Sequence, residues 1–444
     1  MWEPIRMSKD LKLFGKYVMP SIIAMVIGGS FSIVDTIFIG QADGKNGLAA
    51  VSLTWPLLML LMGFGSLIGG GGAVLISQCG GAGDQKRKQE IFDTTIFMII
   101  VSSLVLFVSV FPFLEDILRF AGANAELMGV SLRYSQIILA GLVVSIAMNA
   151  FLEIVRNDGH PTLAMAMMVT GLLGNLVLDW LFVFYFNYGA VGAGIATIVS
   201  EAIIALMGVI YFCSPWTELR FTLKIFRPLL QEIKNITVTG LPIFGNMISI
   251  IAMLYMHNEQ SLRYGGVDAL AAYTVIAALE SLGSMLLTGI AGGIQPLTAS
   301  MYGAGKHKRQ NRFGNMGYVT AFIVGIMLTV FSFCMYKVMP EWMGLDSGRA
   351  RDLAMTGILI SAPAFLLLGL IRVAAFYYQS TGNIAKSSWL IYGDSFLALP
   401  LCIFVLPLFW GINGVWMAMP VSRILLMLML LYFWFGTKKK RKTV

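Results

Sequence analysis

The sequence predicts an all-α membrane protein with twelve transmembrane helices in two six-helix lobes related by pseudo-two-fold symmetry. Three observations predict this fold class: scarce charge, a series of long apolar stretches, and an internal repeat. Of the 444 residues, 57% are hydrophobic and 12% are charged, whereas soluble domains carry about 25% charged residues. The composition therefore favours a chain whose surface meets lipid.

Twelve stretches have the length, about 20 mostly apolar residues, that a helix needs to cross a bilayer. They cover residues 13–39, 48–79, 91–113, 130–155, 162–186, 191–213, 236–261, 269–300, 314–338, 353–378, 387–409 and 413–435. Almost no residues remain for a soluble domain. The first stretch lacks the small-residue cleavage site of a secretory signal, so we expect a first membrane helix there.

The second half of the sequence repeats the first at an offset of 222 residues. The matched positions include Pro20 with Pro242, Gly81-Ala82-Gly83 with Gly303-Ala304-Gly305, Lys86-Arg87 with Lys308-Arg309, and Ser200 with Ser422. Six helices is an even number, so both halves enter the membrane from the same side, as parallel repeats. We predict an N-terminal lobe over 1–213, a cytoplasmic linker over 214–235 and a C-terminal lobe over 236–444.

The net charge of +8 is a topology signal. Most Lys and Arg residues fall in the loops that lie on one side when the N-terminus is inside. The positive-inside rule therefore places both termini in the cytoplasm of a multi-pass protein of the cytoplasmic (inner) membrane. The basic clusters suit anionic lipid headgroups, and we expect no nucleic-acid partner and a monomer.

Carboxylates inside membrane helices are expensive, and they mark functional sites by default. Asp35, Asp179 and Thr197 each lie about 8–9 Å below the outer end of their helix at 1.5 Å per residue. Asn175 lies one turn from Asp179 on the same face, and Tyr134 opens the fourth helix from outside. Two acids in one apolar pocket cannot both ionise cheaply, so one holds a proton or both share a cation. The alternative is a hydrogen-bonded pair that only joins helices.

The C-terminal half does not repeat this polar set. The positions equivalent to Asp35, Asn175 and Asp179 hold His257, Leu397 and Leu401. Glu280, Arg372 and Asp394 lie in its helices instead. We expect either an ion pair between Arg372 and a carboxylate or, together with His257, a second polar patch for substrate.

Glu201 and Arg423 occupy equivalent positions in the last helix of each half. A further hypothesis places these two side chains opposite each other between the lobes.

The sequence carries no motif for catalysis or metal binding. Its three histidines, at positions 160, 257 and 307, are scattered, and neither a metal-ligand spacing nor a nucleophile elbow is present. We therefore predict that the protein is not an enzyme and has no catalytic residue, resident metal or cofactor.

The motifs resemble the multidrug and toxic compound extrusion (MATE) family over nearly the whole chain. They are Pro20 with Val34-Asp35-Thr36, the run Gly47–Ser52, the run Arg156–Pro161, and Asn175-Leu176-Val177-Leu178-Asp179. In the proton-coupled prokaryotic branch, the positions of Asp35, Asn175, Asp179, Thr197 and Tyr134 form the cation site of the N-terminal lobe. The first-helix proline, here Pro20, is linked in that branch to helix bending on protonation.

The sequence departs from the sodium-coupled branch, whose members carry a glutamate in the middle of the seventh helix. Residues 241–251 of that helix contain none. The missing glutamate favours the branch with the cation site in the N-terminal lobe, and that site can take either a proton or sodium. The resemblance thus implies an ion-coupled antiporter, with a proton favoured over sodium, that exports cationic or amphipathic small molecules by alternating access. The alternative is a flippase of a lipid-linked precursor from a related family. Such proteins line their cleft with several basic residues, whereas here only Arg372 and Arg423 are expected to be cations within the membrane.

Overall fold

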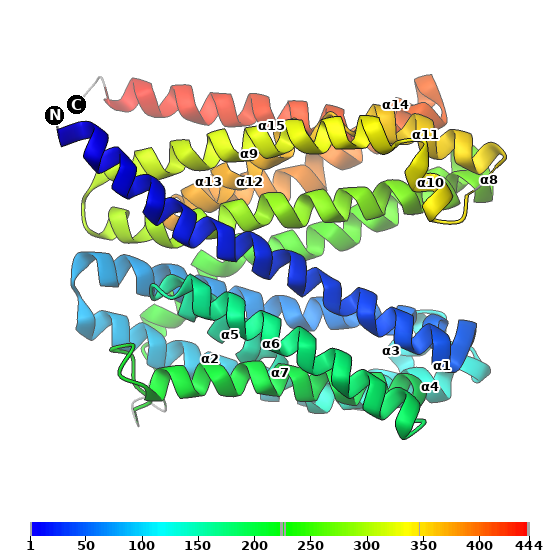
Figure 1. Ribbon diagram of the computed structural model, residues 1–444, viewed down its shortest axis with the longest axis horizontal. Helices are drawn as coiled ribbons and strands as arrows, with labels where there is room; N and C mark the ends of the chain where they lie inside the picture. The colour runs from blue at the N-terminus through cyan, green and yellow to red at the C-terminus, as the bar shows by residue number, and fades with distance from the viewer. Residues whose placement is uncertain (1, 223–224, 226–227, 346, 442–444) are drawn as a thin grey trace. The chain divides into compact units, whose positions relative to one another are not determined.

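The computed structural model describes residues 2–222, 225, 228–345 and 347–441, which are almost entirely helical and contain no strand. Four residues of the predicted linker, 223–224 and 226–227, lie outside this description. The elements shown in Figure 1 are α1 (Trp2–Ala82), α2 (Gln85–Val110), η1 (Phe111–Phe113), α3 (Leu114–Phe120), α4 (Ala125–Ala140), α5 (Leu142–Asn157), α6 (Pro161–Asp179), η2 (Trp180–Tyr185), α7 (Gly189–Cys213), α8 (Leu230–Gly303), α9 (His307–Met335), α10 (Val338–Trp342), α11 (Arg349–Ser361), α12 (Ala364–Ser380), α13 (Ile384–Gly393), η4 (Asp394–Ala398), α14 (Leu399–Trp410) and α15 (Ile412–Arg441).

Two glycines break the two longest helices at equivalent positions of the repeat. Gly44 in α1 has φ 58° and Gly266 in α8 has φ 71°. Glycine adopts this left-handed backbone at little cost because it has no Cβ. Each long helix therefore consists of two membrane-length helices joined by a sharp turn.

The number of spans agrees with the prediction. Within the described residues, nine helices are long and apolar enough to cross a membrane, and two pairs bent by 54° and 50° raise the number to eleven. Helix α8 counts once among them although it has 74 residues, about 110 Å at 1.5 Å per residue. Divided at Gly266, it supplies two spans, which gives twelve and confirms the predicted fold class.

The outer faces of the helices are apolar. On α2, the side chains of Leu104, Val105 and Val108 are 61%, 54% and 60% exposed. Soluble proteins rarely expose such large apolar patches, whereas a bilayer accommodates them because its interior is itself apolar. The chain is a multi-pass membrane protein.

The helices form two compact units. The N unit comprises residues 23–244 and 299–306, and the C unit comprises residues 1–22, 245–298 and 307–444. The divisions after Ile22 and after Phe244 are also 222 residues apart. Each unit therefore includes the beginning of the first helix of the other half of the sequence. The two units thus do not coincide with the first and second halves of the chain.

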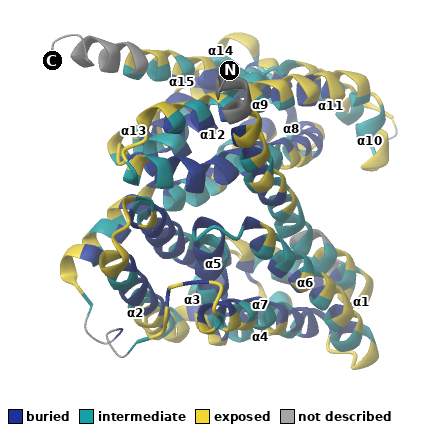
Figure 2. Ribbon diagram, turned by 60° about the vertical axis from the view of Figure 1, so that its left-hand side comes forward, coloured by how far each residue is buried: buried dark blue, intermediate teal, exposed yellow. Residues whose placement is uncertain are grey.

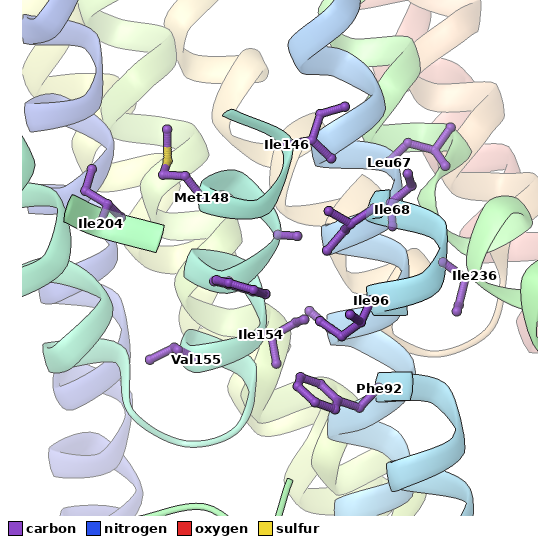
Figure 3. Close-up of a cluster of buried hydrophobic side chains, with 14 of the residues drawn as sticks. Leu67, Ile68, Phe92, Ile96, Ile146, Met148, Ile154, Val155, Ile204 and Ile236 are labelled. Atoms are coloured by element: carbon purple, nitrogen blue, oxygen red, sulfur yellow. The ribbon is translucent and has the colours of Figure 1, made fainter. Parts of the chain in front are cut away.

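The N unit is built around one large cluster of buried apolar side chains, drawn in Figure 3. It includes Leu67 and Ile68 of α1, Phe92 and Ile96 of α2, Ile146 and Ile154 of α5, Ile204 of α7 and Ile236 of α8. Close backbone approach is possible because Gly69 and Gly71 lack side chains: a Cβ there would overlap the backbone of Ala150 and Ile236, respectively. Figure 2 shows the buried residues of α2 and α5 within this unit.

In the C unit, α9 packs against α12 and α14 packs against α15. A smaller core of Ile371, Ala374, Leu390, Ile391 and Leu426 joins α12, α13 and α15. Both the N unit and the C unit thus bury apolar side chains between helices, and they present the remaining apolar surface outward.

Equivalent ion pairs hold the beginnings of α1 and α8, here called the exchanged helix beginnings, in the unit of the other half of the sequence. In the C unit, Asp10 of α1 lies 2.7 Å from Arg309 and 2.9 Å from Arg312 of α9. In the N unit, Glu232 of α8 lies 3.0 Å from Arg87 of α2. Asp10 and Glu232 are equivalent under the repeat, as are Arg87 and Arg309. Each ion pair therefore joins residues from opposite halves of the sequence.

Candidate ion-coupling site

The N unit holds Asp35 and Thr197 side by side. The hydroxyl of Thr197 in α7 donates to Oδ2 of Asp35 in α1 at 3.1 Å, and it also contacts the carbonyl of Ala193 at 2.9 Å. The other carboxylate oxygen of Asp35, Oδ1, is buried and has no hydrogen-bond partner among the described residues. The predicted contact between the first and sixth helices is therefore present.

Helix α6 brings Asn175 and Asp179 to the same place. Both side chains are fully buried, and both lie close enough to Asp35 to interact with its carboxyl group. None of their side-chain oxygen and nitrogen atoms makes a regular hydrogen bond in the described part of the chain. A π-helical segment, η2, begins directly after Asp179, and such segments are frequent at functional sites.

Tyr134 and Glu201 complete the surroundings of the acids. Tyr134 of α4 is buried, and it interacts electrostatically with Asp35, Asp179 and Glu201. Its ring packs on α7 where Gly194 leaves room, since a Cβ there would lie 3.1 Å from Tyr134 Cδ2. The five residues predicted for this site are thus gathered in one unit.

The hypothesis that Glu201 lies opposite Arg423 concerns residues of two different units and stays a prediction; within its own unit, each of them has a partner. In the N unit, the hydroxyl of Ser145 in α5 donates to Oε2 of Glu201. Glu201 also interacts electrostatically with Asp35, so it is a third acid of the same cluster. Its helical position alone could not show this, because the face on which a mid-helix residue lies depends on how the helix is rotated.

The cluster of Asp35, Asp179 and Glu201, hereafter the acidic cluster, has no basic partner in residues 2–222, 225, 228–345 and 347–441. None of its members takes part in the ion pairs found among the described residues. Carboxylates held in a low-dielectric region without counter-charges cannot all be ionised cheaply. The arrangement can therefore take up a proton or a small cation and release it again.

The motif Arg156–Pro161 has a structural role at the end of α5. Asp158 lies 2.7 Å from the ammonium group of Lys88 and accepts hydrogen bonds from Tyr211 at 2.7 Å and from Thr217. The ring nitrogen Nδ1 of His160 lies 2.8 Å from the same tyrosine hydroxyl. These contacts hold the segment after α7 against α2 and α5, and they do not reach the acidic cluster.

The C unit contains a mixed cluster of charges. Arg423 of α15 pairs with Asp394, at the start of the π-helical segment η4, and lies 3.9 Å from Glu280 of α8. Arg372 of α12 instead donates to the amide oxygen of Asn246 in α8. We expected an ion pair between Arg372 and a carboxylate, but the cation that pairs with a carboxylate here is Arg423. We call Glu280, Arg372, Asp394 and Arg423 the mixed cluster.

His257 lies in an aromatic stack of the C unit. Its ring is stacked on that of Tyr273 at 5.0 Å and 6°, and Tyr273 is stacked on Trp416 at 6.3 Å and 11°. The imidazole Nδ1 contacts the carbonyl of Met253 at 2.9 Å. His257 interacts electrostatically with Arg423, but no hydrogen bond or ion pair joins it to the mixed cluster among the described residues.

Pro20 is buried inside an unbroken part of α1, two residues before the division between the units. The first non-helical residue of α1 is Gly44. The bend that the resemblance implies at Pro20 therefore stays a prediction about another state of the protein.

Known proteins match over most of the chain. The sequence model of the MatE family matches residues 20–181 and 242–404. The multidrug export protein MepA of Staphylococcus haemolyticus is 25% identical over 414 residues, 92% of this chain and 89% of its own length. MepA of Staphylococcus aureus strain MSSA476 is 23% identical over 418 residues, 92% and 90% of the two chains.

Solved structures share the fold. An outward-facing multidrug resistance MATE family transporter of the MOP superfamily superimposes with a TM-score of 0.92 and 20% identity over 98% of this chain and 97% of its own. A MOP superfamily transporter from Pyrococcus furiosus, described as having reversed polarity of its binding pocket, gives 0.89 and 21% over 97% and 96%. Because the MatE model matches well over half of the chain, the protein belongs to the MatE family, the multidrug and toxic compound extrusion family that its motifs resemble.

Proposed function

We propose that this protein is an ion-coupled antiporter that exports cationic or amphipathic small molecules, with Asp35, Asn175 and Asp179 at the centre of its coupling site. The observation that carries the proposal is an acidic cluster that is buried within the membrane-spanning helices and lacks a basic partner in the part of the chain that the structure describes. The curated relatives are named multidrug export proteins, which supports export of drug-like compounds.

The coupling cycle follows from the charge of the cluster. When an ion enters, it neutralises a carboxylate that is costly to keep ionised away from water. Loss of that charge changes the electrostatic interactions among Asp35, Asp179 and Glu201, and therefore the relative stability of the conformations that hold them. Release of substrate and uptake of the ion on one side of the membrane are thus linked, because both depend on the same equilibrium between conformations.

We propose the proton as the coupling ion. A proton needs only one free carboxylate oxygen, and Oδ1 of Asp35 and both oxygens of Asp179 lack regular hydrogen bonds among the described residues. A sodium ion would need several oxygen ligands converging on one point. Both termini are proposed to face the cytoplasm of a cytoplasmic membrane, from the distribution of Lys and Arg in the loops, with a monomer as the working unit.

The test is transport in proteoliposomes that hold a proton gradient or a sodium gradient, imposed separately. We expect accumulation of a fluorescent cationic dye against its gradient when the pH gradient is present, and its collapse on adding a protonophore. Dye movement driven only by sodium would correct the ion and keep the antiport. Dye movement indifferent to both gradients would refute coupling.

A further inference from the structure

Glu201 lies halfway along α7 (Gly189–Cys213), about 18 Å from either end at 1.5 Å per residue. The residue is buried, with 3% exposure. It is therefore a carboxyl group near the middle of a membrane-spanning helix, where an ionised acid is expensive. An acid at such a depth calls for a function.

Helix α7 brings Glu201 close to Asp35. Glu201 follows Thr197 by one helical turn, so the two side chains lie on the same face of α7. Thr197 donates to Oδ2 of Asp35 at 3.1 Å, and Glu201 interacts electrostatically with the same carboxyl group. Glu201 itself accepts a hydrogen bond from the hydroxyl of Ser145 in α5. One face of α7 thus presents to Asp35 both a hydroxyl donor and a further acid.

The contact with Ser145 does not require an ionisable group. The amide oxygen of a glutamine would accept the same hydrogen bond without the cost of a buried acid. The ionisable groups that interact with Glu201 are Asp35 of α1 and the phenol of Tyr134 in α4, and Asp179 of α6 belongs to the same cluster. No ion pair among the described residues includes Glu201. A role as a helix contact therefore does not explain the carboxyl group.

The repeat shows what the equivalent position does in the C unit. Arg423 occupies it in α15, where the guanidinium pairs with Asp394 and lies 3.9 Å from Glu280. One position of the scaffold thus supplies a neutralising cation in the C unit and an additional acid in the N unit. A third acid beside Asp35 and Asp179 raises the number of protons that the acidic cluster must hold to approach neutrality.

We propose that Glu201 is a second proton-binding residue of the coupling cycle, so that two protons move for each substrate exported. The pair Asp35 and Asp179 holds one proton and Glu201 holds the other. Both protons enter from the outer side and leave to the cytoplasm. The proposal rests on the proposed function, because it sets the stoichiometry of that transport. A bound proton needs no cavity, since it occupies one oxygen of a carboxyl group.

The stoichiometry is measured as a reversal point in proteoliposomes whose membrane potential is held at zero with valinomycin and equal potassium concentrations. Flux of a fluorescent cationic dye should reverse at a dye gradient of about 100-fold per unit of pH difference for two protons, and about tenfold for one. We expect wild type to reverse at about 100-fold and Glu201→Gln at about tenfold. Reversal of wild type at tenfold, or of both proteins at one gradient, would overturn the proposal.

A second variant separates the proton from the hydrogen bond. Glu201→Gln keeps an acceptor for Ser145 and loses the acid, whereas Ser145→Ala loses the hydrogen bond and keeps the acid. Ser145→Ala should therefore reverse at the wild-type gradient. The matched control, Glu115→Gln, removes an exposed acid of α3 and should do the same. Reversal of Ser145→Ala at about tenfold would mean that the contact, and not the acid, sets the stoichiometry, and would refute the proposal.

Infrared spectroscopy tests the same residue without transport, and it decides the matter for a variant that does not move dye. Difference spectra of the purified protein between low and high pH report the C=O stretch of carboxyl groups that take up a proton. The Glu201 band should be present in wild type, absent from Glu201→Gln, and shifted in Ser145→Ala because its hydrogen bond is lost. Identical spectra of wild type and Glu201→Gln would overturn the proposal.

Failure of the proposed function and failure of this inference give different results. Wild-type dye flux that ignores the pH gradient would refute proton coupling itself. Wild-type flux that reverses at the gradient for one proton would keep the coupling and refute only the role of Glu201.

Discussion

The two units use one repeated scaffold for two different electrostatic arrangements. In the N unit, Asp35, Asp179 and Glu201 form a cluster of acids with no basic partner among the described residues. In the C unit, two acids are matched by Arg372 and Arg423. A cluster of acids without a counter-charge favours uptake and release of an ion. A cluster with equal numbers of acids and arginines can stay ionised throughout the transport cycle. The comparison teaches that duplication preserved the helices and allowed their buried charges to diverge.

The largest expected effect is on stability, at the centre of the mixed cluster. Arg423→Gln leaves Asp394 buried without its cation, and removing one member of a buried ion pair costs about 3–5 kcal/mol. The measurement is thermal unfolding of the detergent-purified protein. Glu201→Gln is the matched change in the N unit, and we expect about 1 kcal/mol or less because its partner Ser145 is neutral. The double variant with Asp394→Asn should regain most of the loss; no recovery would show that the two charges are not coupled.

The next effect is on transport, at equivalent positions of the repeat. Asp35→Asn should lower drug efflux from everted vesicles by about 100-fold or more, equivalent to about 2.7 kcal/mol, because the amide cannot take up a coupling ion. His257→Asn should keep efflux, since His257 belongs to the aromatic stack of the C unit and is not a member of the acidic cluster. Asp116→Asn, at an exposed position of α3, controls for expression. Full efflux by the Asp35 variant would remove the acidic cluster from the mechanism.

A third comparison concerns the ends of α5 and α12, which correspond in the repeat. Asp158→Asn takes the counter-charge from the buried Lys88 and should lower the free energy of unfolding by about 2–3 kcal/mol. In the C unit, the hydroxyl of Thr381 contacts the carbonyls of Tyr377 and Tyr378 and the side-chain amide of Asn383, all of which are neutral. Thr381→Ala should therefore cost about 1 kcal/mol. Similar losses of unfolding free energy at the two positions would contradict the idea that the ion pair between Asp158 and Lys88 stabilises its helix end more than the neutral contacts of Thr381 do.

The smallest effects are expected at the two equivalent ion pairs. Asp10 is 4% exposed and meets two arginines, while Glu232 is 8% exposed and meets Arg87, which is 46% exposed. Pairs with a solvent-exposed arginine contribute about 1 kcal/mol or less. Asp10→Asn should therefore lower the free energy of unfolding by about 1 kcal/mol and Glu232→Gln by about half of that. If thermal unfolding showed a larger loss for Glu232→Gln than for Asp10→Asn, the second arginine beside Asp10, Arg312, would add nothing to stability.

The sequence predicts the spans and much of the acidic cluster because both depend on simple periodic properties. Hydropathy locates the helices, the offset of 222 residues shows that the two halves are equivalent, and counting residues from helix ends places Asp35, Asp179 and Thr197 at one depth. Helix rotation is not accessible in this way. Arg372 and Arg423 both lie inside helices, and which of them meets Asp394 depends on local backbone geometry, including η4, that apolar periodicity does not encode. The partner of Glu201 was missed for the same reason.

The exchanged helix beginnings have a consequence for how the protein is made. Asp10 leaves the ribosome early, yet its partners Arg309 and Arg312 follow 299 and 302 residues later. At a synthesis rate of about 5–20 residues per second, that interval is about 15–60 s. The first helix must therefore enter the bilayer long before its final neighbours exist, and neither half of the chain can complete its compact unit alone. Two fragments divided in the segment 214–235 should reconstitute the protein only when they are produced together.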